Sequence, residues 1–138
     1  PFPPDSDNRA KQLEMVSGTD TAYKLAKRYK IKTSFATDVP FSKALANRQG
    51  AQLTKLTRWY STAELLTMAT ATNGALLALS GPRNPYPGKL GVVEQGALAD
   101  LLLVDGNPIE NVKLIENPDK NFLVIMKDGK VYKNLLAR

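Results

Sequence analysis

Asp38 is the residue of this sequence that is best placed to do chemistry. It directly follows residues 31–37, whose β-branched and aromatic side chains predict a strand. In barrel enzymes, residues at the carboxyl end of a strand point into the active site, where an aspartate can bind a metal ion or accept a proton from water. A simpler interpretation is also open. An aspartate before Val39 and Pro40 is typical of a turn, in which its carboxylate accepts a nearby backbone N–H.

The residue counts limit the chemistry that this chain could perform alone. It contains no histidine and no cysteine, which excludes disulfides and thiolate zinc sites. A catalytic zinc needs about three protein ligands and an open position, and Asp38 offers one carboxylate. Asp100 and Asp105 flank a predicted strand at residues 101–104. We expect them to be turn and edge residues rather than metal ligands.

A second group of polar residues lies in predicted loops. Arg83, Asn84 and Tyr86 belong to a rigid connector that contains two prolines and a glycine, where they could reach a substrate. We favour the alternative, in which they hold the connector in place by hydrogen bonding. Arg48 and Gln49 are weaker candidates for substrate contact, and the sequence does not choose among these residues.

The net charge of +6 raises the question of a polyanionic partner. Five cations gather within one stretch: Lys24, Lys27, Arg28, Lys30 and Lys32. Most lie opposite the apolar residues of the same predicted helix, which favours the hydrated face of an amphipathic helix. Aromatic residues are not interleaved with them as a stacking platform would require. We therefore expect no nucleic-acid partner. We expect no membrane partner either, because no apolar run approaches the roughly 18–20 residues of a membrane span.

The elements that would position Asp38 begin with helices. Residues 8–16 predict a short helix that either ends at Gly18 or continues through it. Thr19 or Asp20 is a good N-cap for a following helix. The apolar spacing of that helix predicts that it buries a stripe formed by Ala22, Leu25, Ala26 and Tyr29.

Further helices are predicted between the strand and the connector. Residues 42–48 indicate a loop or weak helix, and residues 52–59 carry a helical stripe. Residues 61–64 form a capping-box pattern that opens another helix. Thr72 or Asn73 could cap one more, which would end at residues 80–82.

The remainder predicts strands and turns. Residues 90–93 indicate a short strand, and the apolar run at residues 101–104 predicts a strand buried on both faces. Residues 112–115 indicate a helical turn. Residues 122–127 and 131–133 predict two strands joined by a tight turn at Asp128 and Gly129. The fold class is therefore α/β, or mixed α+β for the chain taken alone.

Residues 82–108 and 125–133 closely resemble the C-terminal signature and closing hairpin of the metal-dependent amidohydrolase superfamily, in the branch around imidazolonepropionase-like and dipeptidase-like members. The resemblance implies that residues 1–81 form the last helix–strand–helix elements of a TIM-type (β/α)8 barrel. It implies that residues 82–138 form C-terminal strands of the flanking composite β-sandwich.

The same resemblance implies a role for Asp38. Phe35-Ala36-Thr37-Asp38 is similar to the family's Gly-Thr-Asp at the end of the last barrel strand, with Ala36 in place of the usual glycine. The family's aspartate ligates the metal and serves as general base, so Asp38 is expected to be both the catalytic and the metal residue. No other cofactor-binding residue is expected in this chain.

The resemblance implies that the full-length enzyme is a hydrolase that acts on C–N bonds. It would use a divalent metal, with zinc as the first expectation. The family's histidine ligands would lie upstream of Pro1, so this chain alone is expected to hold no metal and to be inactive. Its expected partners are the missing N-terminal part of the barrel and a small amide or dipeptide-like substrate, and exposed apolar surface would also allow a homo-oligomer. The alternatives are a non-catalytic binding or assembly module and, third, a basic polyanion-binding domain.

Overall fold

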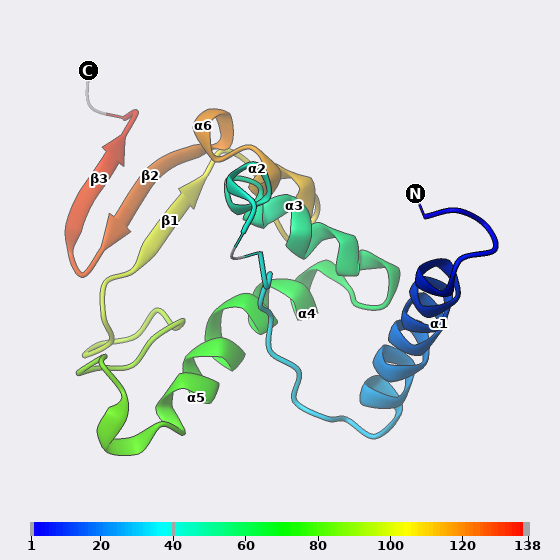
Figure 1. Ribbon diagram of the computed structural model, residues 1–138. Helices are drawn as coiled ribbons and strands as arrows, with labels where there is room; N and C mark the ends of the chain where they lie inside the picture. Colours follow the sequence, from blue (N-terminus) through cyan, green and yellow to red (C-terminus); the bar gives the residue numbers. More distant parts are fainter. Residues whose placement is uncertain (1, 40, 137–138) are drawn as a thin grey trace. The chain divides into compact units, whose positions relative to one another are not determined.

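A computed structural model describes residues 2–39 and 41–136. The chain divides into two compact units, Pro1–Thr33 and Ser34–Arg138, which are described separately. The first contains one helix, α1 (Asp7–Arg28; Figure 1). Ser6 caps its start by accepting a hydrogen bond from the Arg9 N–H. Lys27 and Arg28 lie in its last turn, where the helix dipole stabilises positive charge.

Helix α1 runs without a break through Gly18, so the longer of the two predicted helices is the correct one. The prediction that Thr19 or Asp20 caps a second helix is wrong, because both lie inside α1. The Thr19 hydroxyl donates to the Met15 carbonyl at 2.7 Å, and Asp20 pairs with Lys24 at 2.6 Å. Both polar side chains find partners one turn away, so neither interrupts the helix.

The predicted burial of the α1 stripe is also wrong for this chain. Leu25 is 43% and Tyr29 64% exposed, Ala22 is exposed and Ala26 is half-buried. No residue of α1 is buried. The described part of the first unit contains no second helix or strand that could cover the stripe.

The predicted strand at residues 31–37 is absent, since these residues form neither helix nor strand. A strand requires a hydrogen-bonded neighbour. Among the described residues no strand pairs with this segment.

The second unit starts its regular structure with three short helices, α2 (Lys43–Ala46), α3 (Gln49–Thr54) and the 3₁₀ turn η1 (Lys55–Arg58). They confirm the predicted weak helix and the helical stripe. A longer helical run follows in three parts: α4 (Thr62–Thr67), the π-helical segment η2 (Met68–Thr72) and α5 (Asn73–Ala78) (Figure 1).

The start of this run is as predicted and its middle is not. The Ser61–Glu64 capping box is formed in both directions, which confirms it. Neither Thr72 nor Asn73 caps a new helix, because both have helical dihedrals and the run is continuous. The run ends at Ala78, and the turn η3 (Gly81–Arg83) begins at Gly81, whose φ is 54°.

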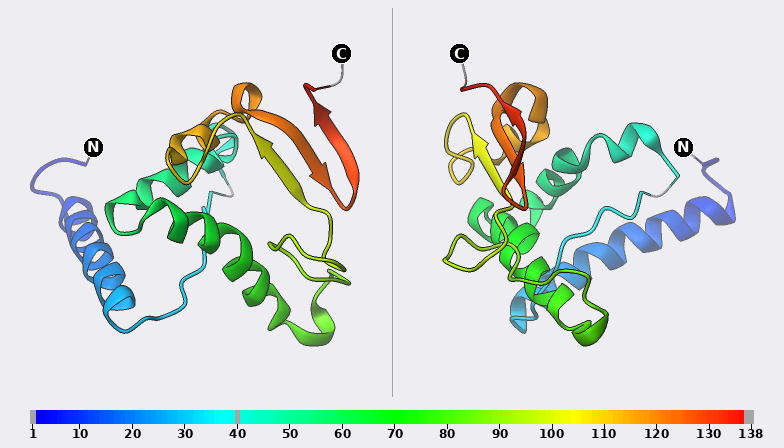
Figure 2. Two further views of the ribbon diagram at one scale, coloured as in Figure 1. Left: turned by 180° about the vertical axis from the view of Figure 1, so that it is seen from behind. Right: turned by 90° about the vertical axis from the view of Figure 1, so that its left-hand side faces the viewer.

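Three antiparallel strands form the sheet, in the order β1 (Leu101–Val104), β2 (Phe122–Lys127) and β3 (Lys130–Asn134). Figures 1 and 2 show them side by side. Asp128 and Gly129 join β2 to β3 with φ of 48° and 73°, as the hairpin prediction requires. Between β1 and β2 lie η4 (Val112–Glu116), which confirms the predicted helical turn, and α6 (Pro118–Asn121).

Two further predictions about strands differ from the structure. Residues 90–93 contribute no strand, and the backbone pairs locally only at the isolated bridge of Lys89 with Ala97. Strand β1 is present but not buried on both faces, since Leu101, Leu102 and Leu103 are 38%, 55% and 46% exposed. Among the described residues β2 is the one strand paired with β1, which leaves its other edge open.

The core of the second unit lies between the helices and the start of the sheet. Its buried apolar residues are Leu53, Leu56, Tyr60, Leu65, Met68, Val112 and Phe122. They come from α3, η1, α4, η2, η4 and β2, with Tyr60 in the bend before α4, so the core joins the helical run to the segment that leads into the sheet. No helix in the described part of the chain is both long and apolar enough to cross a membrane.

Candidate functional site

Asp38 lies at the end of the irregular segment that opens the second unit. Its side chain is exposed and its backbone has φ 46°, a left-handed conformation that aspartate tolerates better than most residues. No described hydrogen bond or ion pair engages its carboxylate. The carboxylate is therefore free to meet a ligand or a water molecule. Among the described residues it does not accept the local backbone N–H expected of a simple turn.

The segment before Asp38 is held by a side chain from the helical run. The Phe35 N–H donates to Asn73 Oδ1 at 2.9 Å, and Asn73 Nδ2 donates to the Phe35 carbonyl, also at 2.9 Å. Both atoms of one carboxamide thus pair with both backbone groups of one residue. The contact supplies at Phe35 the hydrogen bonds that a neighbouring strand would supply.

A second contact lies closer to Asp38. The Thr37 hydroxyl is 3.5 Å from Gln49 Oε1, a long hydrogen bond that links the segment to the first residue of α3. Gln49, a weak candidate from the sequence, is thereby placed beside the segment that ends at Asp38. Arg48, the other weak candidate, lines a separate cavity.

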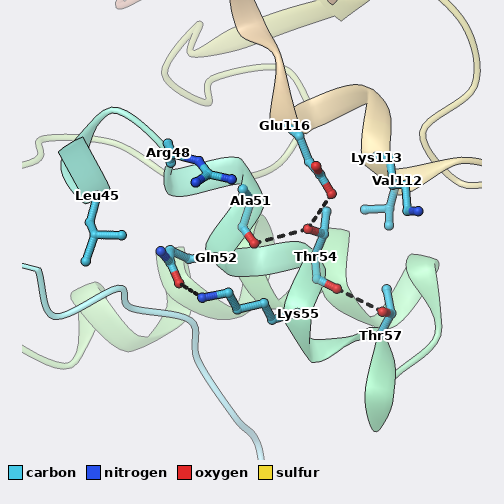
Figure 3. Close-up of a pocket in the computed structure, with 10 residues that line it drawn as sticks. All are labelled: Leu45, Arg48, Ala51, Gln52, Thr54, Lys55, Thr57, Val112, Lys113 and Glu116. Carbon is cyan, nitrogen blue, oxygen red and sulfur yellow. Dashed lines mark hydrogen bonds between the residues drawn. The ribbon is translucent and has the colours of Figure 1, made fainter. Parts of the chain in front are cut away.

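That cavity, of about 320 Å³, lies between α3, η1 and η4 (Figure 3). Its charged lining residues are Arg48, Lys55, Lys113 and Glu116. Thr54, only 8% exposed, donates its hydroxyl proton to Glu116 Oε1 at 2.7 Å, and Lys55 donates to Gln52 at 2.7 Å. The Thr54–Glu116 contact joins α3 to η4, so these two lining residues have a structural role. Asp38 does not line it.

The connector residues are engaged within the protein. Asn84 Oδ1 accepts from the Tyr86 N–H at 3.2 Å, and Lys127 Nζ lies 5.7 Å from the centre of the Tyr86 ring. These contacts agree with the interpretation that the connector is held in place, here against β2. Arg83 is exposed at the end of η3, where no described contact assigns it a function.

The acidic residues beside β1 do not gather at a metal site. Asp100 accepts the Asp128 N–H at 2.7 Å and lies 3.7 Å from Lys127 Nζ, so it fixes the hairpin turn. Asp105 is exposed at the end of β1. Within residues 2–39 and 41–136, no three acidic side chains come close enough together to hold a metal ion.

Sequence reasoning selected Asp38 and missed Asn73. The sequence predicts a helix cap at this asparagine, which is the ordinary role of this residue type near a helix start. Its partner Phe35 lies 38 residues away. The one local sign was that an asparagine is a poor choice for a helix interior unless its side chain bonds elsewhere.

No protein-family model and no curated protein sequence matches the chain. Solved structures do. An amidohydrolase is 29% identical with a TM-score of 0.71, over 84% of this chain and 26% of that one. The chain has the fold of the C-terminal portion of an amidohydrolase-superfamily protein.

Two further structures share this amidohydrolase fold at lower identity. A prolidase in complex with N-methylphosphonate-L-proline is 21% identical with a TM-score of 0.69, over 83% of this chain and 26% of that one. The ochratoxinase of A. niger is 20% identical with a TM-score of 0.74, over 96% and 29%. The chain therefore spans about a quarter of the length of the amidohydrolase structures that it matches.

Proposed function

We propose that this chain is part of a hydrolase that cleaves a C–N bond in a small amide or dipeptide-like substrate, with Asp38 as its catalytic carboxylate. The observation that carries the proposal is the 29% identity with an amidohydrolase over 84% of the chain. The exposed, unengaged carboxylate of Asp38 supports the choice of residue.

The proposed division of the chain follows from where its elements lie. Residues 1–81 would form the end of a (β/α)8 barrel, and residues 82–138 would belong to a flanking β-sandwich. The helices up to α5 precede residue 81, and the three strands follow residue 100. Residues 31–37 have a strand-like composition without a strand partner, as expected of a barrel strand whose neighbours belong to another part of the polypeptide.

Asp38 would act as the general base. Its carboxylate would accept a proton from the water that attacks the amide carbon and would pass it to the leaving nitrogen, so that the C–N bond breaks with a neutral amine as product. Such a base must lie within hydrogen-bond reach of the water. An exposed carboxylate without a competing partner satisfies this requirement.

The residues of this chain do not fit a complete metal site. A catalytic zinc needs about three protein ligands, whereas the sequence has no histidine or cysteine and the described residues contain no cluster of three acidic groups. A divalent metal would therefore depend on ligands from outside this chain. We expect the isolated chain to retain no stoichiometric zinc and to hydrolyse no amide.

The test compares the chain alone with a longer polypeptide that includes the coding sequence immediately upstream of Pro1. The longer protein should hydrolyse a panel of N-acyl amino acids and dipeptides, whereas the chain alone should not. Asp38→Asn keeps the size and the left-handed backbone and removes the base, and it should lower kcat about 10²–10⁴-fold. The matched control is Asp105→Asn, an exposed aspartate at the end of β1, which should stay within twofold.

Two results would contradict this assignment. One is zinc retained by the isolated chain at one equivalent after dialysis, together with amide hydrolysis. The other is an active longer protein in which Asp38→Asn is as active as Asp105→Asn. If the chain is instead a self-sufficient binding or assembly module, it should sediment as one species and unfold cooperatively. The uncovered stripe of α1 argues against that alternative.

A further inference from the structure

Asn73 makes an unusual contact for a residue within a helical run. Its carboxamide donates to the carbonyl and accepts from the N–H of Phe35, both at 2.9 Å, in the pattern by which one strand residue pairs with another. An asparagine inside a helix costs up to about 0.7 kcal/mol relative to alanine. Two hydrogen bonds to partly buried backbone groups can offset that cost.

The π-helical segment η2 determines where Asn73 points. A π turn contains an additional residue compared with an α turn, so every residue after it is rotated by about 100° around the helix relative to an uninterrupted α-helix. Asn73 is the first residue after η2. Without that rotation, its side chain would leave the helix in a different direction from the one in which it meets Phe35.

The helix is fixed at this point by close backbone contacts. A Cβ added to Gly74 would lie 2.3 Å from the Leu90 carbonyl oxygen, and one added to Gly91 would lie 2.2 Å from that of Thr70. Residues 90 and 91 therefore approach η2 and α5 as closely as backbone allows. The helix that carries Asn73 is held by residues 90 and 91 and cannot easily shift away from Phe35.

We propose that Asn73 is a positioning residue that sets the place of Asp38. Phe35 is three residues before Asp38, and Thr37 adds the long hydrogen bond to Gln49. Fixing the backbone at Phe35 limits where the carboxylate of Asp38 can go. The inference rests on the proposed function for its catalytic consequence, and on the two hydrogen bonds alone for its structural one.

The structural consequence is tested in the chain as it stands, by amide hydrogen exchange. In Asn73→Ala, the Phe35 N–H should exchange at least tenfold faster than in the parent chain, relative to the amides of α4. Asn73→Asp keeps the acceptor and loses the donor, and it should give a smaller acceleration. Asn111→Ala removes an asparagine that accepts the Lys113 N–H elsewhere, and it should leave Phe35 unchanged. Equal Phe35 exchange in Asn73→Ala and the parent chain would overturn the proposal.

The catalytic consequence is tested in the longer polypeptide. Asn73→Ala should lower kcat at least tenfold while KM stays within threefold, because displacing a reacting group by about 1 Å can cost about 10²-fold in rate. Asn111→Ala should lower neither. An unchanged kcat in Asn73→Ala, beside a large loss in Asp38→Asn, would overturn the positioning role. If Asp38→Asn itself has no effect, the proposed function fails, and the exchange experiment still decides whether Asn73 holds Phe35.

Discussion

Helices α1 and α4 start alike and end up in opposite environments. Each is capped by a serine, Ser6 or Ser61, and each carries two leucines. Leu65 of α4 is completely buried, whereas Leu13 and Leu25 of α1 are 52% and 43% exposed. The comparison teaches that a helix can start from a local cap, whereas the burial of its side chains depends on a partner. Helix α4 has that partner within the second unit, whereas the described part of the first unit offers none to α1.

The largest expected difference in the free energy of unfolding is between variants of Leu65 and of Leu25. Leu65→Ala should lower the free energy of unfolding of the second unit by about 3–5 kcal/mol, because it leaves a cavity in the core. Leu25→Ala should change it by less than about 0.5 kcal/mol. Urea unfolding followed by the fluorescence of Trp59, the single tryptophan, measures both. Leu65→Met keeps the volume and should cost less than about 1.5 kcal/mol.

The same pair of variants sharpens the comparison in the longer polypeptide. If the rest of an amidohydrolase covers the α1 stripe, Leu25→Ala should there cost about 2–5 kcal/mol, close to Leu65→Ala. A cost that stays below about 0.5 kcal/mol in both proteins would mean that α1 remains uncovered and would contradict the proposed barrel.

A smaller difference is expected between two glycines. Gly91→Ala should cost about 2–4 kcal/mol, because alanine disfavours φ 72° and its Cβ would meet the Thr70 carbonyl. The Cβ added by Gly18→Ala in α1 meets no atom within 4 Å. This change should stabilise α1 by up to about 1 kcal/mol and so increase its helicity. Urea unfolding measures the first and circular dichroism the second. A loss of helicity in Gly18→Ala would show that α1 is packed at this point after all.

The elements that could be predicted from the sequence are those with local causes. The capping box at Ser61 and the turn at Asp128 and Gly129 each require only neighbouring residues, and both are formed. The strands β2 and β3 follow from that turn together with the apolar residues beside it. Asp38 was likewise selected from the residues next to it, and its catalytic role stays a prediction.

The elements that failed depend on groups that are not their neighbours in the sequence. The segment at residues 31–37 has strand composition and no strand partner, and β1 has an apolar run and one open edge. The sequence predicts Asn73 as a cap, whereas its side chain bonds Phe35, 38 residues away. Neither periodicity nor turn chemistry contains information on which distant group a side chain will meet.

The smallest expected difference is between the two capping serines. Ser61→Ala should lower the free energy of unfolding of the second unit by about 1 kcal/mol, because the Glu64 N–H loses its acceptor at the start of a helix that carries the core. Ser6→Ala removes the same type of bond from α1 and should leave the urea midpoint of Trp59 unchanged, while it weakens exchange protection in the first turn of α1. Ser80→Ala, which removes no capping bond, is the control. An equal shift of the Trp59 midpoint in Ser6→Ala and Ser61→Ala would mean that α1 unfolds together with the core, and the contrast between the two helices would then be wrong.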